Sequence, residues 1–161
     1  IIASVQGAAA GIGFSFASGC DLVIAADDSY FTLAYCQIGT SPDGGSTWFL
    51  PRLLGPKRTM GFALLGNKID AQTALSLGLV NQVVPRAALE VEALKVAERL
   101  ASGANKAYAK AKALINSSFD NSLEDHLLAE KEAFIHSVAT EDFREGISSF
   151  VEKRPPTFKG C

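Results

Sequence analysis

Three glycines around a run of alanines are the first candidates for chemistry. Gly7, Gly11 and Gly13 lie in the string Gly-Ala-Ala-Ala-Gly-Ile-Gly, directly after the apolar run Ile2–Val5. Glycines there let the backbone approach a ligand closely and let the amides of a helix N-terminus point outward. The spacing is not the dinucleotide fingerprint Gly-x-Gly-x-x-Gly, and the Gly-Lys-Ser/Thr of a P-loop is missing. The string therefore predicts either tight helix-on-sheet packing or a pocket of amides for an oxyanion.

A single carboxylate in a stiff loop is the second candidate. Asp43 lies between Pro42 and the pair Gly44-Gly45, in the loop that follows Ile38. A carboxylate on a backbone with few side chains around it is accessible and well placed for acid/base work. Asp before Gly is equally common in ordinary turns, so the loop alone leaves both interpretations open.

Other polar and aromatic residues predict structure rather than chemistry. Ser15 lies in a predicted buried helix with no histidine near it in sequence, so we do not expect a serine nucleophile. Trp48 and Phe49 are expected to fill the core, and the cations Arg52, Lys57 and Arg58 to cover a solvated helix surface. The few potential metal ligands, Cys20, Cys36, Cys161, His126 and His136, are spread along the chain. They predict free thiols and no metal site.

The elements that must position these residues change character near residue 85. The first part is rich in glycine and has strand-like runs at 2–5, 21–26, 30–33 and 79–84. Between them we expect a turn and short buried helix over 8–19, a helix capped by Ser46 or Thr47, one restarting at Pro56, and one beginning at 70–72. The second part has helical periodicity over 87–102, 105–117, 122–137 and 141–151, and Arg154-Pro155-Pro156 ends it. An α/β region, 1–85, followed by a helical module, 86–161, is predicted.

Composition excludes several function classes. The chain has 161 residues and a formal net charge of −2, so bulk charge predicts no nucleic-acid partner and no anionic membrane partner. No apolar run reaches the roughly 20 residues of a membrane span, and we expect a cytoplasmic protein. The first residues lie inside a predicted strand without an initiating Met, which suggests a fragment of a larger domain.

Taken together, these motifs resemble the crotonase (enoyl-CoA hydratase/isomerase) superfamily. The resemblance is carried in order by Ser4–Gly13, Cys20–Leu22, the run from Phe31 through Ile38–Gly45, Leu50–Gly55, Ala71 to Pro85, Phe143 to Gly146, Phe150 and Lys153-Arg154. It covers the C-terminal two-thirds of the usual family domain. It implies a spiral ββα core followed by a helical trimerisation module, and a homotrimer or hexamer.

The resemblance also implies a chemistry and a set of site residues. The family binds acyl-CoA thioesters and stabilises a thioester enolate in an oxyanion hole of two backbone amides. One amide corresponds to Ile12, next to Gly11, and the other belongs to an earlier segment that this chain does not contain. Further substrate-binding positions correspond to Gly7, Ala8, Gly11, Tyr35, Phe134 and Lys153, the last two near the CoA adenine and phosphate. No metal or other cofactor is implied, because coenzyme A is part of the substrate.

Three positions narrow the expected reaction. The two glutamates of the family's hydratases correspond to Ser15 and Tyr35, and neither residue is a carboxylate. Asp43 corresponds to the loop acid of dienoyl-CoA and ring-epoxide isomerases and some aryl-CoA dehalogenases, and the string Pro42–Arg52 looks most like the 1,2-epoxyphenylacetyl-CoA isomerase branch of phenylacetate catabolism. We therefore expect an acyl-CoA isomerase with Asp43 as proton shuttle. An enoyl-CoA hydratase and a truncated, non-catalytic chain remain the alternatives.

Overall fold

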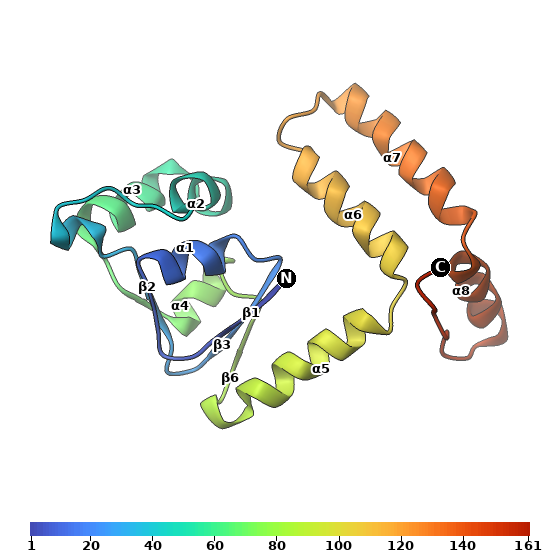
Figure 1. Cartoon of the computed structure of the whole chain (residues 1–161), viewed down its shortest axis with the longest axis horizontal. Coiled ribbons are helices and arrows are strands. Elements are labelled where there is room, and N and C mark those ends of the chain that lie inside the picture. The colour runs from blue at the N-terminus through green and yellow to red at the C-terminus, as the bar shows by residue number, and fades with distance from the viewer. The chain divides into compact units, whose positions relative to one another are not determined.

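Two three-stranded sheets form the frame of the first part of the chain (Figure 1). The computed structural model describes residues 1–161, which divide into two compact units, Ile1–Lys95 and Val96–Cys161. One sheet has the order β1-β3-β6, all parallel, with β1 (Ile2–Val5), β3 (Leu22–Ala26) and β6 (Gln82–Val84). The other has the order β2-β4-β5, with β2 (Ala8–Ala10), β4 (Tyr30–Thr32) and the antiparallel β5 (Ile69–Asp70).

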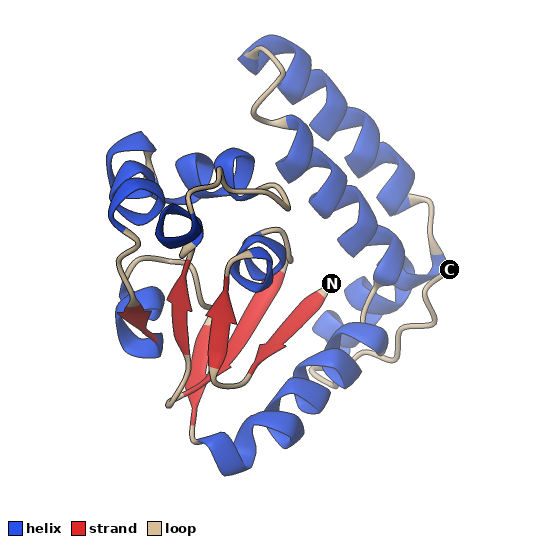
Figure 2. Ribbon diagram, turned by 60° about the vertical axis from the view of Figure 1, so that its left-hand side comes forward, coloured by secondary structure: helices blue, strands red, loops and turns tan.

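The chain visits the two sheets in turn and then forms a helix, which is the spiral ββα pattern expected. The first turn is β1, β2 and α1 (Ile12–Ser18). The second turn is β3, β4, the 3-10 helix η1 (Tyr35–Ile38), α2 (Ser46–Leu54) and α3 (Pro56–Leu65). The helix α4 (Ala71–Ser76) follows β5, and η2 (Arg86–Ala88) follows β6. Figure 2 shows the strands of this unit as arrows that lie next to one another.

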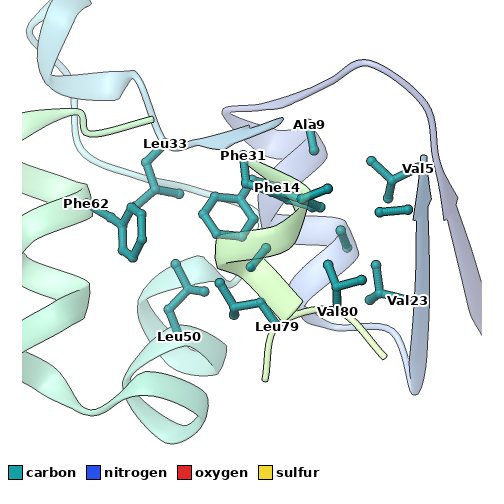
Figure 3. Close-up of a cluster of buried hydrophobic side chains, with 14 of the residues drawn as sticks. Val5, Ala9, Phe14, Val23, Phe31, Leu33, Leu50, Phe62, Leu79 and Val80 are labelled. Atoms are coloured by element: carbon teal, nitrogen blue, oxygen red, sulfur yellow. The ribbon is translucent and has the colours of Figure 1, made fainter. Parts of the chain in front are cut away.

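The core of the first unit is built around Phe14 of α1 (Figure 3). Its ring is 1% exposed and packs against Phe31 and Phe62, with ring centroids 5.4 Å and 6.0 Å away. The central strand β3 is buried continuously from Val23 to Ala26, as expected for a parallel strand covered on both faces. This packing fixes α1, whose N-terminus carries the glycine string.

Two expectations about backbone elements are corrected by the structure. Residues 8–10 form strand β2 rather than part of a turn, because Ala9 is buried and pairs with Phe31 of β4. The strand expected over 79–84 is shortened to β6: Leu79 and Val80 are buried in the core, and the Asn81 side chain accepts a hydrogen bond from the Val23 amide at 2.8 Å.

Two expectations about α2 are also wrong. Its N-cap is Gly45, and Ser46 begins the helix with a buried side chain, so neither Ser46 nor Thr47 is the cap. Trp48 is 54% exposed rather than part of the core, because the buried face of α2 is formed by Ser46, Leu50 and Leu54, spaced four apart. The Arg52 guanidinium lies over the Trp48 ring, 3.3 Å from its centroid.

Four helices follow in the second part of the chain, close to the expected ranges. They are α5 (Leu89–Ala101), which crosses from the first unit into the second, α6 (Asn105–Ser117), α7 (Leu123–Val138) and α8 (Glu141–Glu152). Ser122 and Thr140 cap α7 and α8, each accepting a hydrogen bond at 3.1 Å from the amide three residues later. A functional boundary after residue 85 stays a prediction. None of the helices is long and apolar enough to cross a membrane.

The C-terminal tail folds back onto α8 through two carboxylates. The Asp142 side chain is 4% exposed and accepts hydrogen bonds from the amides of Lys159, at 2.7 Å, and Gly160, at 2.9 Å. The Glu145 carboxylate pairs with the Arg154 guanidinium through two contacts, one of which is 2.9 Å long. It also accepts a hydrogen bond from the Thr157 amide at 2.8 Å. These bonds lower the pKa of Glu145 from 4.5 to about 2, with the Arg154 hydrogen bond as the largest cause.

A lowered carboxylate pKa makes the stability of this tail pH-dependent. Because the folded-state pKa of Glu145 lies below the unfolded value of 4.5, its contribution is complete above pH 4.5 and is lost as the pH falls towards about 2. We expect the Tm difference between the native chain and its Glu145→Gln variant to shrink over this interval. Thermal unfolding followed by circular dichroism at several pH values measures it. A Tm difference that stays constant from pH 6 to pH 2 would contradict this account.

Candidate active site

The loop that carries Asp43 lies directly on helix α1. Gly44 and Gly45 have φ angles of 63° and 88°, which turn the chain into α2. A Cβ atom on Gly44 would lie 2.9 Å from both Ile12 Cγ1 and Ser15 Cβ, so only glycine permits this close approach. The loop therefore places Asp43, with an exposed side chain, beside the first turn of α1.

Three hydroxyl groups fix Asp43 in this position. Tyr35 Oη donates a hydrogen bond to the Asp43 carboxylate. Ser15 Oγ donates to the Asp43 main-chain carbonyl at 2.8 Å, and Ser46 Oγ donates to the same carbonyl at 3.2 Å. Both the backbone and the side chain of Asp43 are thus oriented by groups from three separate elements, α1, η1 and α2. Such support holds an acid/base group in a defined geometry.

Tyr35 is a neutral hydrogen-bond donor in this arrangement. Its side chain is buried, and burial is the largest of the causes that raise the pKa of its phenol above 10.0; the hydrogen bond to Asp43 raises that pKa further. The neighbouring Ser15 hydroxyl lowers the pKa but does not reverse the shift. A phenol with a raised pKa stays protonated near neutral pH, so Tyr35 does not serve there as a base.

The N-terminus of α1 presents a backbone amide next to these groups. Gly11 has a φ angle of 54°, and its carbonyl accepts the first helical hydrogen bonds, from the amides of Phe14 and Ser15 at 3.1 Å each. The amide of Ile12 makes no backbone hydrogen bond within the chain, as is usual for the first residue of a helix. This amide is therefore available to a ligand oxygen, as the oxyanion-hole hypothesis requires.

The structure brings four of the predicted site residues together and places two at the far end of a strand. Gly11, Ile12, Tyr35 and Asp43 are neighbours: a Cβ atom on Gly11 would lie 3.7 Å from Tyr35 Cζ. Ala8 begins β2, about 10 Å of extended chain before Gly11, and Gly7 directly precedes the strand. The Gly7 carbonyl accepts a hydrogen bond from the Tyr30 amide at 2.9 Å, and Ala8 is exposed.

The remaining two predicted residues, Phe134 and Lys153, belong to the second unit. Phe134 lies on α7 and is 66% exposed. Lys153 is the C-cap of α8, with a left-handed φ of 53° and an exposed side chain. Two hollows of about 260 and 320 Å³ next to α8 are lined by neither residue. Contacts of Phe134 and Lys153 with a CoA group stay a prediction.

Sequence reasoning missed the partners of Asp43. The sequence gives no sign that Ser15 contacts Asp43, yet its side chain is fully buried and donates to the Asp43 main-chain carbonyl. Ser46 was expected as a helix cap, and its hydroxyl bonds the Asp43 carbonyl instead. The signal available was the polar character of two buried positions beside an Asp-Gly loop.

Across the described residues, no three His, Cys, Asp or Glu side chains gather in a way that could hold a metal ion.

Comparison with known proteins gives the chain a family. The enoyl-CoA hydratase/isomerase family model matches residues 1–161. The chain is 41% identical to the "Probable enoyl-CoA hydratase" of Rhodobacter capsulatus, over 99% of its own length and 62% of that protein. It is 40% identical to the 1,2-epoxyphenylacetyl-CoA isomerase of Escherichia coli, over 99% of the chain and 61% of that protein. The chain therefore spans about three-fifths of the length of these relatives.

A solved structure supports the same assignment. The crystal structure of an enoyl-CoA hydratase from Polaromonas sp. JS666 superimposes with a TM-score of 0.94 at 40% identity, covering 98% of this chain and 62% of that one. This agreement confirms the expected crotonase fold and the expected correspondence to the C-terminal part of the domain. Because the family model matches residues 1–161, the whole length of this chain, the chain belongs to the enoyl-CoA hydratase/isomerase family.

Proposed function

We propose that this chain carries the acid/base group of an acyl-CoA isomerase, which moves a double bond or rearranges a ring epoxide through a thioester enolate. The supporting observation is the contrast between Asp43 and the two positions that correspond to hydratase glutamates. Asp43 is an exposed carboxylate beside the free amide of Ile12. Ser15 is fully buried and bonded to the Asp43 carbonyl, and Tyr35 donates to the Asp43 carboxylate. A single accessible carboxylate can take a proton from one carbon of the substrate and return it to another, which is the proton transfer that double-bond migration requires.

The proposed steps balance with one carboxylate and one amide donor from this chain. Asp43 takes a proton from the acyl carbon alpha or gamma to the thioester, and the electron pair of that C–H bond moves to the thioester oxygen. The Ile12 amide stabilises the resulting enolate, because a fixed N–H donor gains strength where charge develops. Asp43 then returns its proton to a different carbon, which completes the shift. A second amide donor is proposed to come from the segment that the relatives possess beyond this chain.

Hydration is the second candidate, because several relatives, the Rhodobacter capsulatus protein among them, are named enoyl-CoA hydratases or probable enoyl-CoA hydratases. By the resemblance described above, the family's hydratases use two glutamates to activate and protonate the added water. Here the Ser15 hydroxyl is fully buried and donates within the protein, so it cannot contact a substrate water. Hydration would have to proceed with Asp43 as the one carboxylate, which makes isomerisation the better-supported proposal.

The acyl group is proposed to be an enoyl chain or an aromatic ring epoxide. The similarity to a protein named 1,2-epoxyphenylacetyl-CoA isomerase supports the ring substrate and a place in phenylacetate catabolism. Trp48 is 54% exposed and carries the Arg52 guanidinium over its ring, whereas Phe31 is 1% exposed and belongs to the core. Coenzyme A enters as part of the substrate, and we propose that no metal or redox cofactor takes part.

A product assay tests the proposal. The intact gene product that contains residues 1–161 is given a 3-enoyl-CoA in D₂O, and formation of the 2-enoyl-CoA and its deuterium content are followed by mass spectrometry. Isomerisation is expected, with deuterium exchange at the carbons that gain and lose the proton. Absence of conversion of both 3-enoyl-CoA and the ring epoxide, combined with rapid hydration of a 2-enoyl-CoA, would overturn the proposal and establish a hydratase. Active protein with an intact mass near 17.0 kDa would exclude the non-catalytic alternative.

Assembly and location complete the proposal. We propose a cytoplasmic homotrimer or hexamer that contacts other copies through the C-terminal helices. In the second unit, Phe134 and Ile135 on α7, and Phe150 and Val151 on α8, are large apolar side chains that are more than half exposed. Burial of such side chains between subunits would be favourable. The particle mass from light scattering tests this: a monomer at micromolar concentration would contradict it.

A further inference from the structure

A strained backbone position directly precedes Tyr35. Ala34 has a φ angle of 57° and is one of two non-glycine residues with positive φ, the other being Lys153. A left-handed backbone is unfavourable for alanine, because its Cβ atom comes too close to the following carbonyl oxygen. Hydrogen bonds from the Gln37 amide to the Ala34 carbonyl, at 3.1 Å, and from the Thr40 amide to the Tyr35 carbonyl, at 3.2 Å, hold the turn that follows. Such strain persists only where the surrounding structure imposes it, and Tyr35 follows this position directly as the first residue of η1.

The Tyr35 hydroxyl lies between the Asp43 carboxylate and Gly11, the residue before the Ile12 amide. It donates to the Asp43 carboxylate on one side. On the other side, a Cβ atom on Gly11 would lie 3.8 Å from Tyr35 Oη, so the hydroxyl is next to the residue that precedes the Ile12 amide. With 9% of the residue exposed, Tyr35 has little room to move. Its one hydroxyl proton is already engaged by Asp43.

The three elements that hold Asp43 carry one charged side chain between them. Helices α1 and η1 carry no charged residue, and α2 carries only Arg52, whose guanidinium lies over Trp48 and donates to the Trp48 carbonyl at 3.1 Å. The other titratable group of η1 is the Cys36 thiol, whose sulfur faces Gly66. The Tyr35 hydroxyl is therefore the group on these packed elements that directly contacts the carboxylate.

We propose that Tyr35 is a positioning residue: its hydroxyl holds one oxygen of the Asp43 carboxylate and leaves the other free to exchange a proton with the substrate carbon. This assignment rests on the proposed function of Asp43. It differs from a direct contact of Tyr35 with the substrate, because the hydroxyl acts on the reaction through Asp43. Ser15 and Ser46 hold the backbone of the same residue, so Tyr35 is the specific determinant of carboxylate orientation.

The test uses Tyr35→Phe, which keeps the ring packed beside Gly11 and removes only the hydroxyl. We expect kcat for isomerisation to fall by about tenfold to a hundredfold with KM within twofold, because a misoriented carboxylate slows the step and not the binding. Without its donor the carboxylate form is less stabilised, so the acid limb of the pH–rate profile should move to higher pH. Tyr30→Phe is the matched control, because Tyr30 belongs to β4 and its ring lies under the Lys68 ammonium.

The outcomes separate this proposal from the proposed function. In an Asp43→Asn background, Tyr35→Phe should cause no further loss, since its effect passes through the carboxylate. If Asp43→Asn abolishes isomerisation while Tyr35→Phe keeps native kcat and an unmoved acid limb, the positioning role is wrong and the function stands. Loss of kcat with a raised KM and an unmoved acid limb would instead assign Tyr35 to substrate contact. If Asp43→Asn itself remains active, the function and the role of Tyr35 fall together.

Discussion

Replacing Asp43 by Asn is expected to lower kcat for double-bond migration by about 10²- to 10⁴-fold, the usual contribution of a positioned acid/base group. The amide has nearly the shape of the carboxylate but cannot take up the migrating proton. Its carbonyl oxygen can still accept the Tyr35 hydrogen bond, and the bonds from Ser15 and Ser46 go to the main chain. The loop should therefore keep its structure and the variant its Tm. Steady-state kinetics with 3-enoyl-CoA, together with thermal unfolding, measure both quantities.

Asp28→Asn is the matched control for this substitution. Asp28 lies in the same unit, has an exposed carboxylate and pairs with Arg86, so the same chemical change removes only a surface ion pair. Such pairs are worth about 0–1 kcal/mol, and we expect unchanged kcat and KM. An Asp43→Asn protein that keeps more than a tenth of the native kcat would remove Asp43 from the mechanism. Equal losses in both variants would point to a general effect of charge.

The sequence pattern predicted the elements whose stabilising contacts lie within a few residues along the chain. The helices of the second part follow from apolar periodicity and from side chains such as Ser122 and Thr140, whose capping bonds reach only three residues along the chain. Strand β2 was missed because alanine has little preference for strands, and its pairing with β4 depends on contacts more than twenty residues away. Trp48 was placed in the core by its size, whereas the helical register of α2 turns Ser46, Leu50 and Leu54 inward.

The residues of the candidate site could be predicted from the sequence, but the contacts between them could not. The resemblance pointed to Asp43, Ile12, Ser15 and Tyr35 one by one. Their connection requires the close approach of Gly44 to α1 and the left-handed turn at Ala34, and neither is visible in residue spacing. Tyr35 and Asp43 are eight positions apart in the sequence, a separation at which two side chains of one helix or one strand do not meet. The hydrogen bond between them is a product of tertiary structure.

The role of the Ile12 amide can be tested without altering any acid/base group. Ile12 is the first residue of α1, a position where proline fits the helical backbone and where the missing N–H costs no helical hydrogen bond. Ile12→Pro should therefore fold with a Tm close to that of the native protein while removing one donor to the developing enolate. Loss of one oxyanion donor lowers kcat by about 10²- to 10³-fold. We expect a loss of this size in kcat, with a small change in KM, because the amide gains strength mainly as charge develops.

The Ile12→Val variant distinguishes the effect of the backbone amide on turnover from the effect of the side chain. The Ile12 side chain lies against Gly44, so any substitution alters the contact between α1 and the Asp43 loop, but valine keeps the N–H. Native-like turnover in Ile12→Val with the large loss in Ile12→Pro would assign the effect to the backbone donor. Equal kinetics in the two variants would show that the amide makes no contribution, and the enolate would then need a donor from outside residues 1–161. A double variant with Asp43→Asn tests whether both groups act on one step, because residues that act as a unit lose activity non-additively.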